Sequence, residues 1–412
     1  MKMIAKLLSI ILLIGIASCS SGDEPSNQYR PIELNLKAQQ TIEASNQFGF
    51  NLFTELAEEK PENLMISPFS ISQALDMTWN GASNTTFDEM TSVLCLPDED
   101  AETINQANQT IREALIAADS KIDLGIANSI WYREGYPIAS DFLALNKNYY
   151  DAEVEGLDFS KKEESKTTIN NWVDDKTKGC ISKIVDDITP GHVMFLINAV
   201  YFKGKWTYQF DKDETQDRAF NLINNSSVDV PTMHVEADLA YYEDAACRYV
   251  SIPYGNAHFE MIIALPNEGS SLPDFIAQLD DEAWGEVVNQ LEIKGMSLFL
   301  PKFTFKNNLK LNKPLIDLGM TSAFSDGADF SRMNADGMPE LKIDKVKHKT
   351  FVEVNEEGTE AAAVTSVEVV YTTIGQGGSP MVFNVDRPFL FVIREKDTGA
   401  ILFLGQVYQP EV

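Results

Sequence analysis

Histidines are the side chains of this 412-residue chain best suited to acid–base catalysis or metal binding. There are four of them: His192, His234, His258 and His348. None lies in an HExxH arrangement, and no G-x-S-x-G nucleophile elbow is present. The spacing in 234–238 could suit a metal, but a solvated turn is the simpler interpretation. The glycines of 375–378 precede no helix start, which predicts a loop and not a phosphate cradle. The sequence therefore predicts no enzyme, no metal site and no cofactor.

A segment near the C-terminus has an unusual composition for a strand. From Glu356 to Val370 the residues alternate, with one face of small or apolar side chains and with Glu360 and Glu368 on the other face. The three consecutive alanines of 361–363 are poor strand formers. Small side chains suit a segment that slides into an existing sheet, and we expect the chain to bend at 358–359 to enter.

The elements that position this segment belong to one large domain. Hydrophobic residues make up 44% of the chain and charged residues 23%, as in soluble globular proteins. No repeat, low-complexity tract or linker divides the chain after about residue 40. We predict a single domain over residues 36–412.

The first 35 residues differ from the rest. Lys2 and Lys6 precede an apolar run over 7–16, which is typical of a secretory signal peptide and too short for a membrane span. Residues 1–18 are predicted to be this signal. The small residues before Cys19 resemble a bacterial lipobox, which implies cleavage before Cys19 and attachment of lipid to it. An ordinary signal with a chance cysteine is the alternative.

Residues 19–35 would then be a lipidated cysteine and a flexible tether. Ser20, which follows the cysteine, resembles the residue found in lipoproteins sent to the outer membrane. We therefore expect a cell-envelope protein, bound to the outer membrane only through its lipid anchor. Exposure at the cell surface and a periplasmic orientation both stay open.

Several motifs, in order over residues 40–410, resemble those of the serpins, the serine protease inhibitor family. The segment 356–365 is similar to the family's proximal hinge. The segment 63–71 resembles its early Ser-Pro-x-Ser motif, and 198–206 resembles its central signature. Three further motifs match the family's last third: 300–304, 386–389 and 403–407. The resemblance implies an α+β fold with three β-sheets, several α-helices and an exposed reactive centre loop.

The resemblance also implies an irreversible suicide mechanism. A serine protease attacks the exposed loop and forms an acyl-enzyme, the cleaved loop inserts into the main sheet as a new strand, and the protease is trapped in a covalent 1:1 complex. Seven residues match the family's hinge: Glu356, Gly358, Thr359, Glu360, Ala361, Ala362 and Ala363. No bulky or charged residue occupies an inward position, which favours an inhibitor over a non-inhibitory relative.

The position of the reactive bond is open between neighbours. Counting from the hinge over the spacing usual in the family places the cut after Thr372, and a spacing one residue shorter places it after Tyr371. Tyr371 would suit a chymotrypsin-like pocket, whereas Thr372 or Thr373 would suit elastase-like or subtilisin-like pockets. No basic residue lies between Lys349 and Arg387, which argues against trypsin-like targets. Cysteine proteases with apolar preference stay open.

The resemblance assigns a second group of residues to the moving parts of the main sheet. Four of them would form the shutter, a hydrogen-bond network that rearranges when strands part: Ser67, Ser70, Asn198 and His348. Ser70 could instead be a helix cap. Trp206 would lie at the breach, where insertion begins, and ordinary core packing is its alternative.

The charge and the cysteines limit the partners. A formal charge of −29 disfavours nucleic acids and anionic lipid, although it could serve solubility alone. Arg112 is the only basic residue in 102–118, where some serpins bind heparin, so we predict no heparin activation and a monomer. Cys95, Cys180 and Cys247 fit no disulfide framework or zinc site and are predicted to be isolated thiols, or one bridge at most.

Two other functions stay as alternatives. A non-inhibitory serpin that acts as a binding protein would have a bulky or charged hinge, unlike this chain. A surface lipoprotein that binds glycan or peptide nutrients would expose aromatic platforms. A hydrolase is the most remote alternative, because no catalytic constellation supports it.

Overall fold

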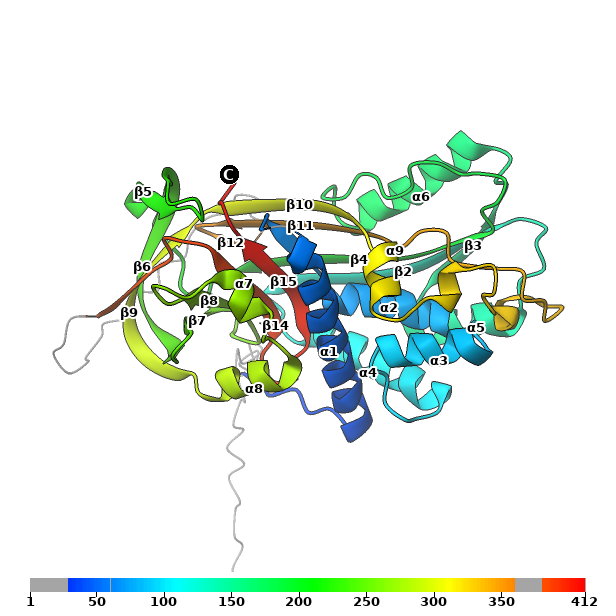
Figure 1. The fold of residues 1–412 in the computed structure, drawn as a ribbon, viewed down its shortest axis with the longest axis horizontal. Helices are drawn as coiled ribbons and strands as arrows, with labels where there is room; N and C mark the ends of the chain where they lie inside the picture. Colours follow the sequence, from blue (N-terminus) through cyan, green and yellow to red (C-terminus); the bar gives the residue numbers. More distant parts are fainter. Residues whose placement is uncertain (1–28, 60, 360–379, 412) are drawn as a thin grey trace, which may run out of the picture.

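The computed structural model describes residues 29–59, 61–359 and 380–411. The described chain forms an elongated α+β molecule, with most helices gathered toward one end and the strongly curved strands of a large sheet at the other (Figure 1). A second sheet runs along the long axis and joins the two ends. The predicted fold class is confirmed in this arrangement.

The long sheet has six strands, and its order is not the order of the chain. From one edge to the other the strands are β10 (Phe303–Lys310), β11 (Lys347–Asn355), β12 (Gly358–Thr359), β4 (Met194–Lys205), β2 (Ile122–Arg133) and β3 (Glu153–Leu157). β12 is antiparallel to both of its neighbours, so β11 and β4 run in the same direction. Within the described residues β11 and β4 share no ladder with each other.

The second sheet has nine strands. Its path is β1 (Leu64–Ile66), β15 (Ile401–Val407), β14 (Phe389–Glu395), β8 (Phe259–Pro266), β7 (Cys247–Tyr254), β6 (Ser227–Glu243), β9 (Glu292–Pro301) and β13 (Met381–Asn384), with β5 (Gln216–Asn221) on β6. Every residue of β8, β14 and β15 is buried, as expected for strands covered on both faces.

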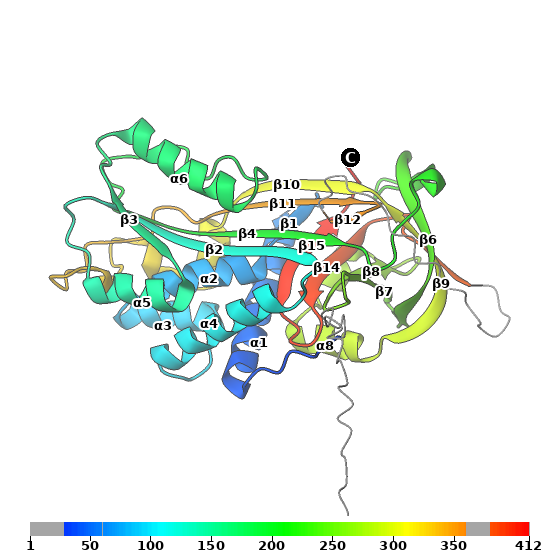
Figure 2. The ribbon, with the colours of Figure 1, turned by 180° about the vertical axis from the view of Figure 1, so that it is seen from behind.

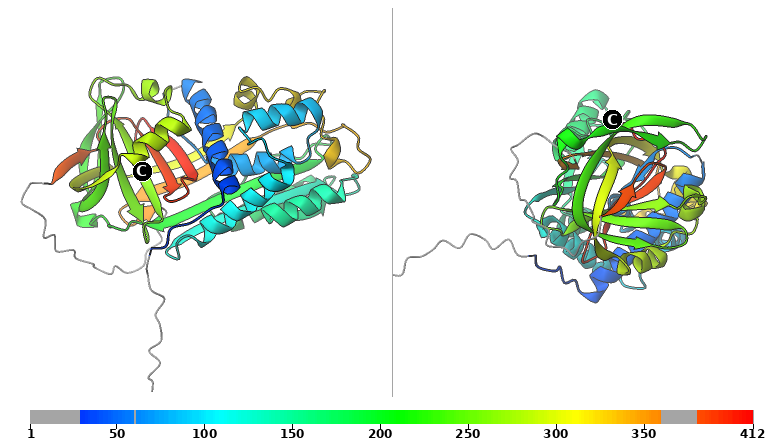
Figure 3. Two further views of the ribbon diagram at one scale, coloured as in Figure 1. Left: turned by 90° about the horizontal axis from the view of Figure 1, so that it is seen from below. Right: turned by 90° about the vertical axis from the view of Figure 1, so that its left-hand side faces the viewer.

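The third sheet expected from the sequence is hydrogen-bonded to the second. The reason is the length of β6, which spans 17 residues. One end of β6 pairs with β5, the other end pairs with β7, and β9 follows it over most of its length. The strands curve strongly between these ends, as the end-on view in Figure 3 shows. The strands expected to form two separate sheets are therefore hydrogen-bonded into one curved sheet.

Helices cover both faces of the six-stranded sheet. The helices of the described chain are α1 (Leu36–Glu59), α2 (Pro68–Trp79), α3 (Asn84–Val93), α4 (Ala101–Ala117), α5 (Ser140–Tyr150), α6 (Lys162–Lys176), α7 (Leu272–Ile276), which packs on β8 of the nine-stranded sheet, α8 (Asp281–Asn289) and α9 (Asn312–Asp317). Short 3-10 turns lie at Lys212–Glu214, Ser322–Phe324 and Ser331–Met333. α6 lies on one face of the sheet, whereas α1 to α5 lie on the other (Figure 2).

α2 is the central helix beneath the sheet. All but one of its 12 residues are buried, and it packs on both β4 and β15. The side chain of Ser67 accepts a hydrogen bond from the backbone N–H of Ser70, and Pro68 occupies the first turn. Both features favour a helix start at this point.

The segment predicted to be a tether contacts the domain at its C-terminal end. The hydroxyl of Tyr29 and the backbone N–H of Ile32 donate hydrogen bonds to Asp397, so residues 29–32 contact the domain before α1 begins at Leu36. These contacts join residues more than 360 positions apart, which no local pattern reveals. Residues 1–28, including Cys19, lie outside the described residues. In the described part of the chain, no helix is both long and apolar enough to cross a membrane.

Within the described residues Cys95, Cys180 and Cys247 form no disulfide. Burial raises the pKa of the Cys247 thiol to about 12 and also raises the pKa of Cys95. The bridge that the sequence leaves open between two of these cysteines is therefore not seen in the described part of the chain.

Candidate functional site

The hinge segment enters the six-stranded sheet between β11 and β4. Gly358 pairs with Asn355 on one side and Lys205 on the other, while Thr359 pairs with Val354 and Gly204. The sequence predicts a bend at 358–359 before the sheet. In the structure these two residues are already within the sheet, and the turn lies one step earlier, at 356–357. We call the place where β12 separates β11 from β4 the entrance.

Position 358 requires glycine because the backbone of β4 lies very close to it. Its φ is +153°, and a Cβ at this position would lie 2.0 Å from the carbonyl oxygen of Gly204 and 2.7 Å from the Cα of Lys205. No side chain fits between backbone atoms at these distances. The glycine predicted as part of the hinge therefore lets the chain approach β4 closely enough to pair with it.

Thr359 points into the molecule. Its side chain is 1% exposed, and its hydroxyl shares a 2.6 Å hydrogen bond with the hydroxyl of Tyr254. Tyr254 in turn stacks on Trp206, with ring centroids 4.3 Å apart and planes at 15°. Burial raises the pKa of Tyr254 above its ordinary value, so its hydroxyl stays protonated. Thr359 thus lies on the inward face that the alternating pattern predicts.

Trp206 holds the turn before the hinge. Its indole Nε1 donates a hydrogen bond to the carbonyl oxygen of Asn355 at 2.8 Å. Its backbone N–H donates to the carbonyl oxygen of Glu357 at 3.0 Å. The backbone N–H of Phe210 donates to the carbonyl oxygen of Glu356 at 3.2 Å. The structure therefore brings the predicted breach residue and the start of the hinge into direct contact.

The two acidic residues of the turn differ in their surroundings. The carboxylate of Glu356 is buried and contacts the Nζ atom of Lys302 at 3.1 Å and the hydroxyl of Thr215 at 2.9 Å. Burial acts to raise the pKa of Glu356, but hydrogen bonds from its own backbone, Lys302 and Thr215 outweigh burial and lower it. Glu357 pairs at 2.7 Å with Lys212, which is largely exposed.

A second group of polar side chains crosses beneath the sheet from β11 to β2. The Nε2 atom of His348 accepts a hydrogen bond from the backbone N–H of Ser67 at 2.9 Å. The hydroxyl of Ser70 donates to Asn198 at 2.6 Å, and Asn198 donates to Asn128 at 2.7 Å. The four predicted shutter residues are thus brought together at the start of α2, with His348 on β11 and Asn198 on β4.

The network continues beyond the residues that the sequence singled out. Asn128 donates to the backbone carbonyl of Tyr150 at 2.8 Å, which ties β2 to the end of α5. A polar Asn128 within the apolar segment 122–131 was the available signal for this residue. Tyr254 offered no such signal, because an aromatic side chain in a strand is ordinary core.

His348 is neutral in this network. Its side chain is buried, and burial lowers its pKa to about 3. Because Nε2 accepts a hydrogen bond, the ring carries its proton on Nδ1. Protonation of Nε2 would remove the acceptor for the Ser67 N–H and place a charge beneath the sheet.

The remaining predicted site residues lie outside the described residues. This holds for the rest of the hinge and for the reactive-bond candidates: Glu360, Ala361, Ala362, Ala363, Tyr371, Thr372 and Thr373.

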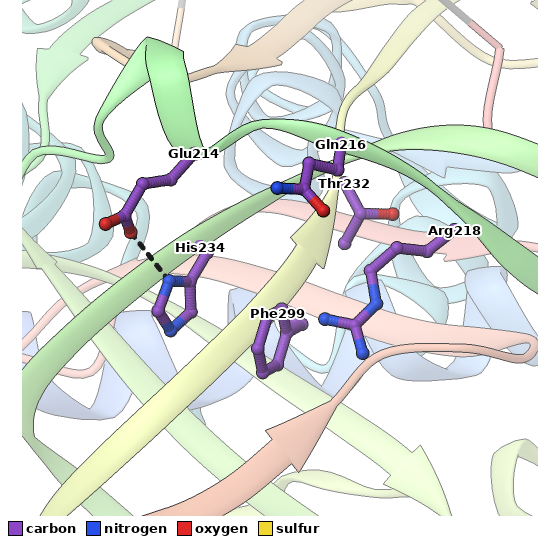
Figure 4. A pocket seen from close by; sticks show the side chains of 6 residues that line it. All are labelled: Glu214, Gln216, Arg218, Thr232, His234 and Phe299. Atoms are coloured by element: carbon purple, nitrogen blue, oxygen red, sulfur yellow. Dashed lines mark hydrogen bonds and ion pairs between the residues drawn. The ribbon is translucent and has the colours of Figure 1, made fainter.

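The segment 234–238, interpreted from the sequence as a solvated turn, lies instead in strand β6. His234 forms part of the wall of a pocket of about 260 Å³ (Figure 4). Its Nδ1 atom lies 2.7 Å from Glu214 and its Nε2 atom 2.9 Å from Ser297, so both ring nitrogens have partners. The ring also stacks on Phe299 at 4.4 Å. The segment is held as a strand by antiparallel pairing with β9, a distant part of the chain, which a local spacing rule could not detect.

Arg112, the basic residue of the region compared with heparin-binding serpins, lies in α4. Its side chain is largely buried, and its guanidinium lies 3.7 Å from Asp151 and 4.0 Å from Glu113. Two carboxylates already face this cation.

Comparison with known proteins agrees with this geometry. The family model "Serpin (serine protease inhibitor)" matches residues 43–410. An uncharacterized serpin-like protein of Methanosarcina mazei is 34% identical over 380 residues, covering 89% of this chain and 87% of its own. The leukocyte elastase inhibitor of Bos taurus is 34% identical over 387 residues, covering 90% and 100%. The crystal structure of the thermophilic serpin tengpin in its native state superposes with a TM-score of 0.81 at 33% identity, covering 92% and 96%. With a hinge glycine seated against β4 and a family match over nearly the whole domain, this chain belongs to the serpin family.

Proposed function

We propose that this serpin is an irreversible suicide inhibitor of serine proteases. The observation that supports it best is the position of β12, which occupies the entrance between two parallel strands that share no ladder in the described chain. A segment that follows Thr359 would continue β12 along both strands. Each backbone hydrogen bond gained in this way is worth about 0.5–1.5 kcal/mol.

The chemistry would be supplied by the protease. Its serine hydroxyl attacks the carbonyl carbon of the reactive bond, an ester forms, the amide bond breaks, and the new amine leaves with the serine's proton. Release of the loop at this cut allows the hinge to extend β12. Trapping requires insertion to finish before water hydrolyses the ester. The chain itself is not an enzyme in this scheme and needs no cofactor.

The target class follows from the residues near the expected cut. Tyr371 favours chymotrypsin-like proteases, while Thr372 and Thr373 favour elastase-like or subtilisin-like proteases, and cysteine proteases of apolar preference are a further option. A relative named for inhibition of leukocyte elastase supports the elastase-like option. We expect a monomer that binds neither nucleic acid nor heparin.

The inward-facing Thr359 argues against the non-inhibitory alternative. In a serpin that acts only as a binding protein, the first inward position could be bulky or charged without loss of function. Here it carries a small side chain that fits beneath Tyr254. The nutrient-binding alternative has no comparable support from the described residues.

A panel of proteases would test the proposal. The purified protein is mixed separately with chymotrypsin, pancreatic elastase, neutrophil elastase, subtilisin and trypsin, and each mixture is examined on denaturing gels. We expect a covalent band that survives boiling with one or more of the first four, and mass spectrometry should give a new N-terminus at Thr372 or Thr373. Clean cleavage without a covalent band by every enzyme would contradict inhibition.

We further propose that lipid on Cys19 anchors the protein in the outer membrane. Labelling of cells with a radioactive fatty acid, followed by fractionation, should place the labelled protein in the outer-membrane fraction. The Cys19→Ser variant should lose the label and leave the membrane. Retention of the label in this variant would contradict the anchor site.

A further inference from the structure

Three segments that are distant in the sequence meet beside the turn that follows Tyr254. The turn between β7 and β8 contributes His258, the end of β14 contributes Glu395, the β14–β15 connection contributes Asp397, and the chain before α1 contributes Tyr29. One ring nitrogen of His258 and one carboxylate oxygen from each acidic residue all lie within 4.8 Å of one another.

One ring nitrogen of His258, which faces this group, has no hydrogen-bond partner among the described residues. Its side chain is 7% exposed, and its Nδ1 atom is buried with no hydrogen-bond partner among the described residues. Nδ1 lies 4.0 Å from an oxygen of Glu395 and 3.8 Å from an oxygen of Asp397, both too long for a hydrogen bond. A buried polar atom without a partner destabilises a fold by about 1–3 kcal/mol, which calls for a specific reason.

The carboxylates also lack a matching cation. Glu395 is fully buried, and its oxygens accept hydrogen bonds from the backbone N–H of Asp397 and from the backbone N–H and hydroxyl of Thr398. Within the described chain, His258 is the only ion-pair partner of Glu395 or Asp397. The neighbouring Arg394 is paired with Glu260 at 2.8 Å. Two carboxylates therefore face a buried imidazole nitrogen with no positive charge between them.

We propose that His258, Glu395 and Asp397 form a binding site for one divalent transition-metal cation, with Zn²⁺ as the best match. Zinc takes imidazole nitrogen at about 2.0–2.1 Å and carboxylate oxygen at about 2.0–2.2 Å. Ligand atoms around a tetrahedral Zn²⁺ lie about 3.3–3.4 Å apart, so the atoms now separated by 3.8 and 4.0 Å would have to close by about half an ångström on binding. The imidazole favours zinc over Ca²⁺ or Mg²⁺, which prefer oxygen ligands. Three protein ligands leave a fourth position for water.

The chain before α1 would complete the site from outside. The backbone N–H of Ile32 donates to Asp397 at 2.9 Å, and the hydroxyl of Tyr29 donates to its other oxygen, so both orient this carboxylate. The ring of Tyr29 stacks on the imidazole of His258 at 4.3 Å, with planes at 16°. Metal binding would therefore fasten the N-terminal segment to two turns of the nine-stranded sheet and stabilise the folded chain.

The test uses the purified protein with its thiols alkylated, because free cysteines also bind zinc. After treatment with EDTA and dialysis, Zn²⁺ is titrated in a calorimeter and the unfolding temperature is measured with and without the metal. We expect one Zn²⁺ per chain and a higher unfolding temperature. Heat and unfolding temperature unchanged by Zn²⁺, Co²⁺ and Mn²⁺ at millimolar concentration would overturn the proposal.

Two substitutions locate the site. His258→Asn and Asp397→Asn should each weaken Zn²⁺ binding by at least about tenfold. His192→Asn is the matched control, since His192 also lies near a carboxylate, 3.1 Å from Asp344, yet belongs to no such cluster among the described residues. Unchanged affinity in both site variants would overturn the proposal, as would a pH-dependent role of His258 in stability without any metal binding.

X-ray absorption spectroscopy of the zinc-loaded wild-type protein gives an answer even if the variants do not fold. The expected spectrum has one imidazole and only oxygen atoms as further ligands. Two or more imidazoles would place the metal elsewhere and overturn the assignment.

Discussion

The hydroxyl of Thr359 lies 2.6 Å from the hydroxyl of Tyr254, directly beneath the point where the hinge enters the six-stranded sheet. This contact shows that the first inward residue of the hinge is already buried before any cleavage. The inward face of the remaining hinge would have to follow the same path, in which small side chains meet the least resistance.

Replacement of Thr359 by arginine should convert the inhibitor into a substrate. A cation at this position would face the buried Tyr254 without a carboxylate partner, and an unpaired buried charge costs several kcal/mol. The hinge would then leave the entrance, and the acyl-enzyme ester would be hydrolysed before the loop had inserted. Denaturing gels with the sensitive protease should show cleaved chain and at least about tenfold less covalent complex, a change of about 1.4 kcal/mol in the competing barriers.

Thr167→Arg on the exposed face of α6 is the control for this substitution, because it adds the same charge far from the entrance. It should trap protease as the wild type does. Undiminished trapping by the Thr359→Arg variant would contradict the insertion model.

Acid should weaken the fold through His348. The pKa of this histidine is about 3 in the folded state, against its usual 6.5. Between these two pH values the unfolded chain binds a proton on the histidine and the folded chain does not. The contribution to stability is complete above pH 6.5 and is lost as the pH falls toward 3. The slope is about 1.4 kcal/mol per pH unit within this window.

His348→Gln isolates that effect, because the glutamine oxygen can still accept the Ser67 N–H but does not titrate. Urea unfolding at pH 4, 5, 6 and 7 should show a steeper loss of stability for the wild type than for the variant. The carboxylates contribute to both proteins and cancel in the difference. Parallel curves would mean that His348 is not held neutral in the folded state.

The two glutamates of the turn should differ in their importance. Glu356→Ala removes a buried partner from Lys302 and Thr215, and we expect a loss of about 1.5–3 kcal/mol in the free energy of unfolding. Glu357→Ala removes a contact with the largely exposed Lys212, for which about 0–1 kcal/mol is usual. Chemical unfolding of both variants measures the two values, and equal losses would contradict this ranking.

The reactive bond can be located by two matched substitutions. If the cut follows Tyr371, Tyr371→Ala should slow chymotrypsin inhibition by about 10–200-fold, since the variant no longer fills the apolar pocket. Thr372→Ala should then leave the association rate nearly unchanged. The reverse ranking, measured against elastase, would place the bond after Thr372.

Local sequence patterns account for the two hinge residues that form β12, Gly358 and Thr359, whereas residues 360–363 of the predicted hinge lie outside the described chain. Gly358 and the inward Thr359 follow from composition and alternation, which are properties of neighbouring residues. The resemblance to serpins supplied Ser67, Ser70, Asn198, Trp206 and His348, and the structure brings each of them to the sheet that accepts the hinge. The role of these residues in insertion stays a prediction.

The sequence by itself determined that the chain has a small-residue hinge within a serpin-like order of motifs. Spacing and side-chain size are properties of residues that are close in the sequence, so they need no tertiary structure. Only the tertiary structure decided that the turn lies at 356–357, that Tyr254 and Asn128 complete the two networks, and that Tyr29 stacks on His258. These contacts join residues that are 70 to 229 positions apart, so they depend on strand register and packing, which no local window contains.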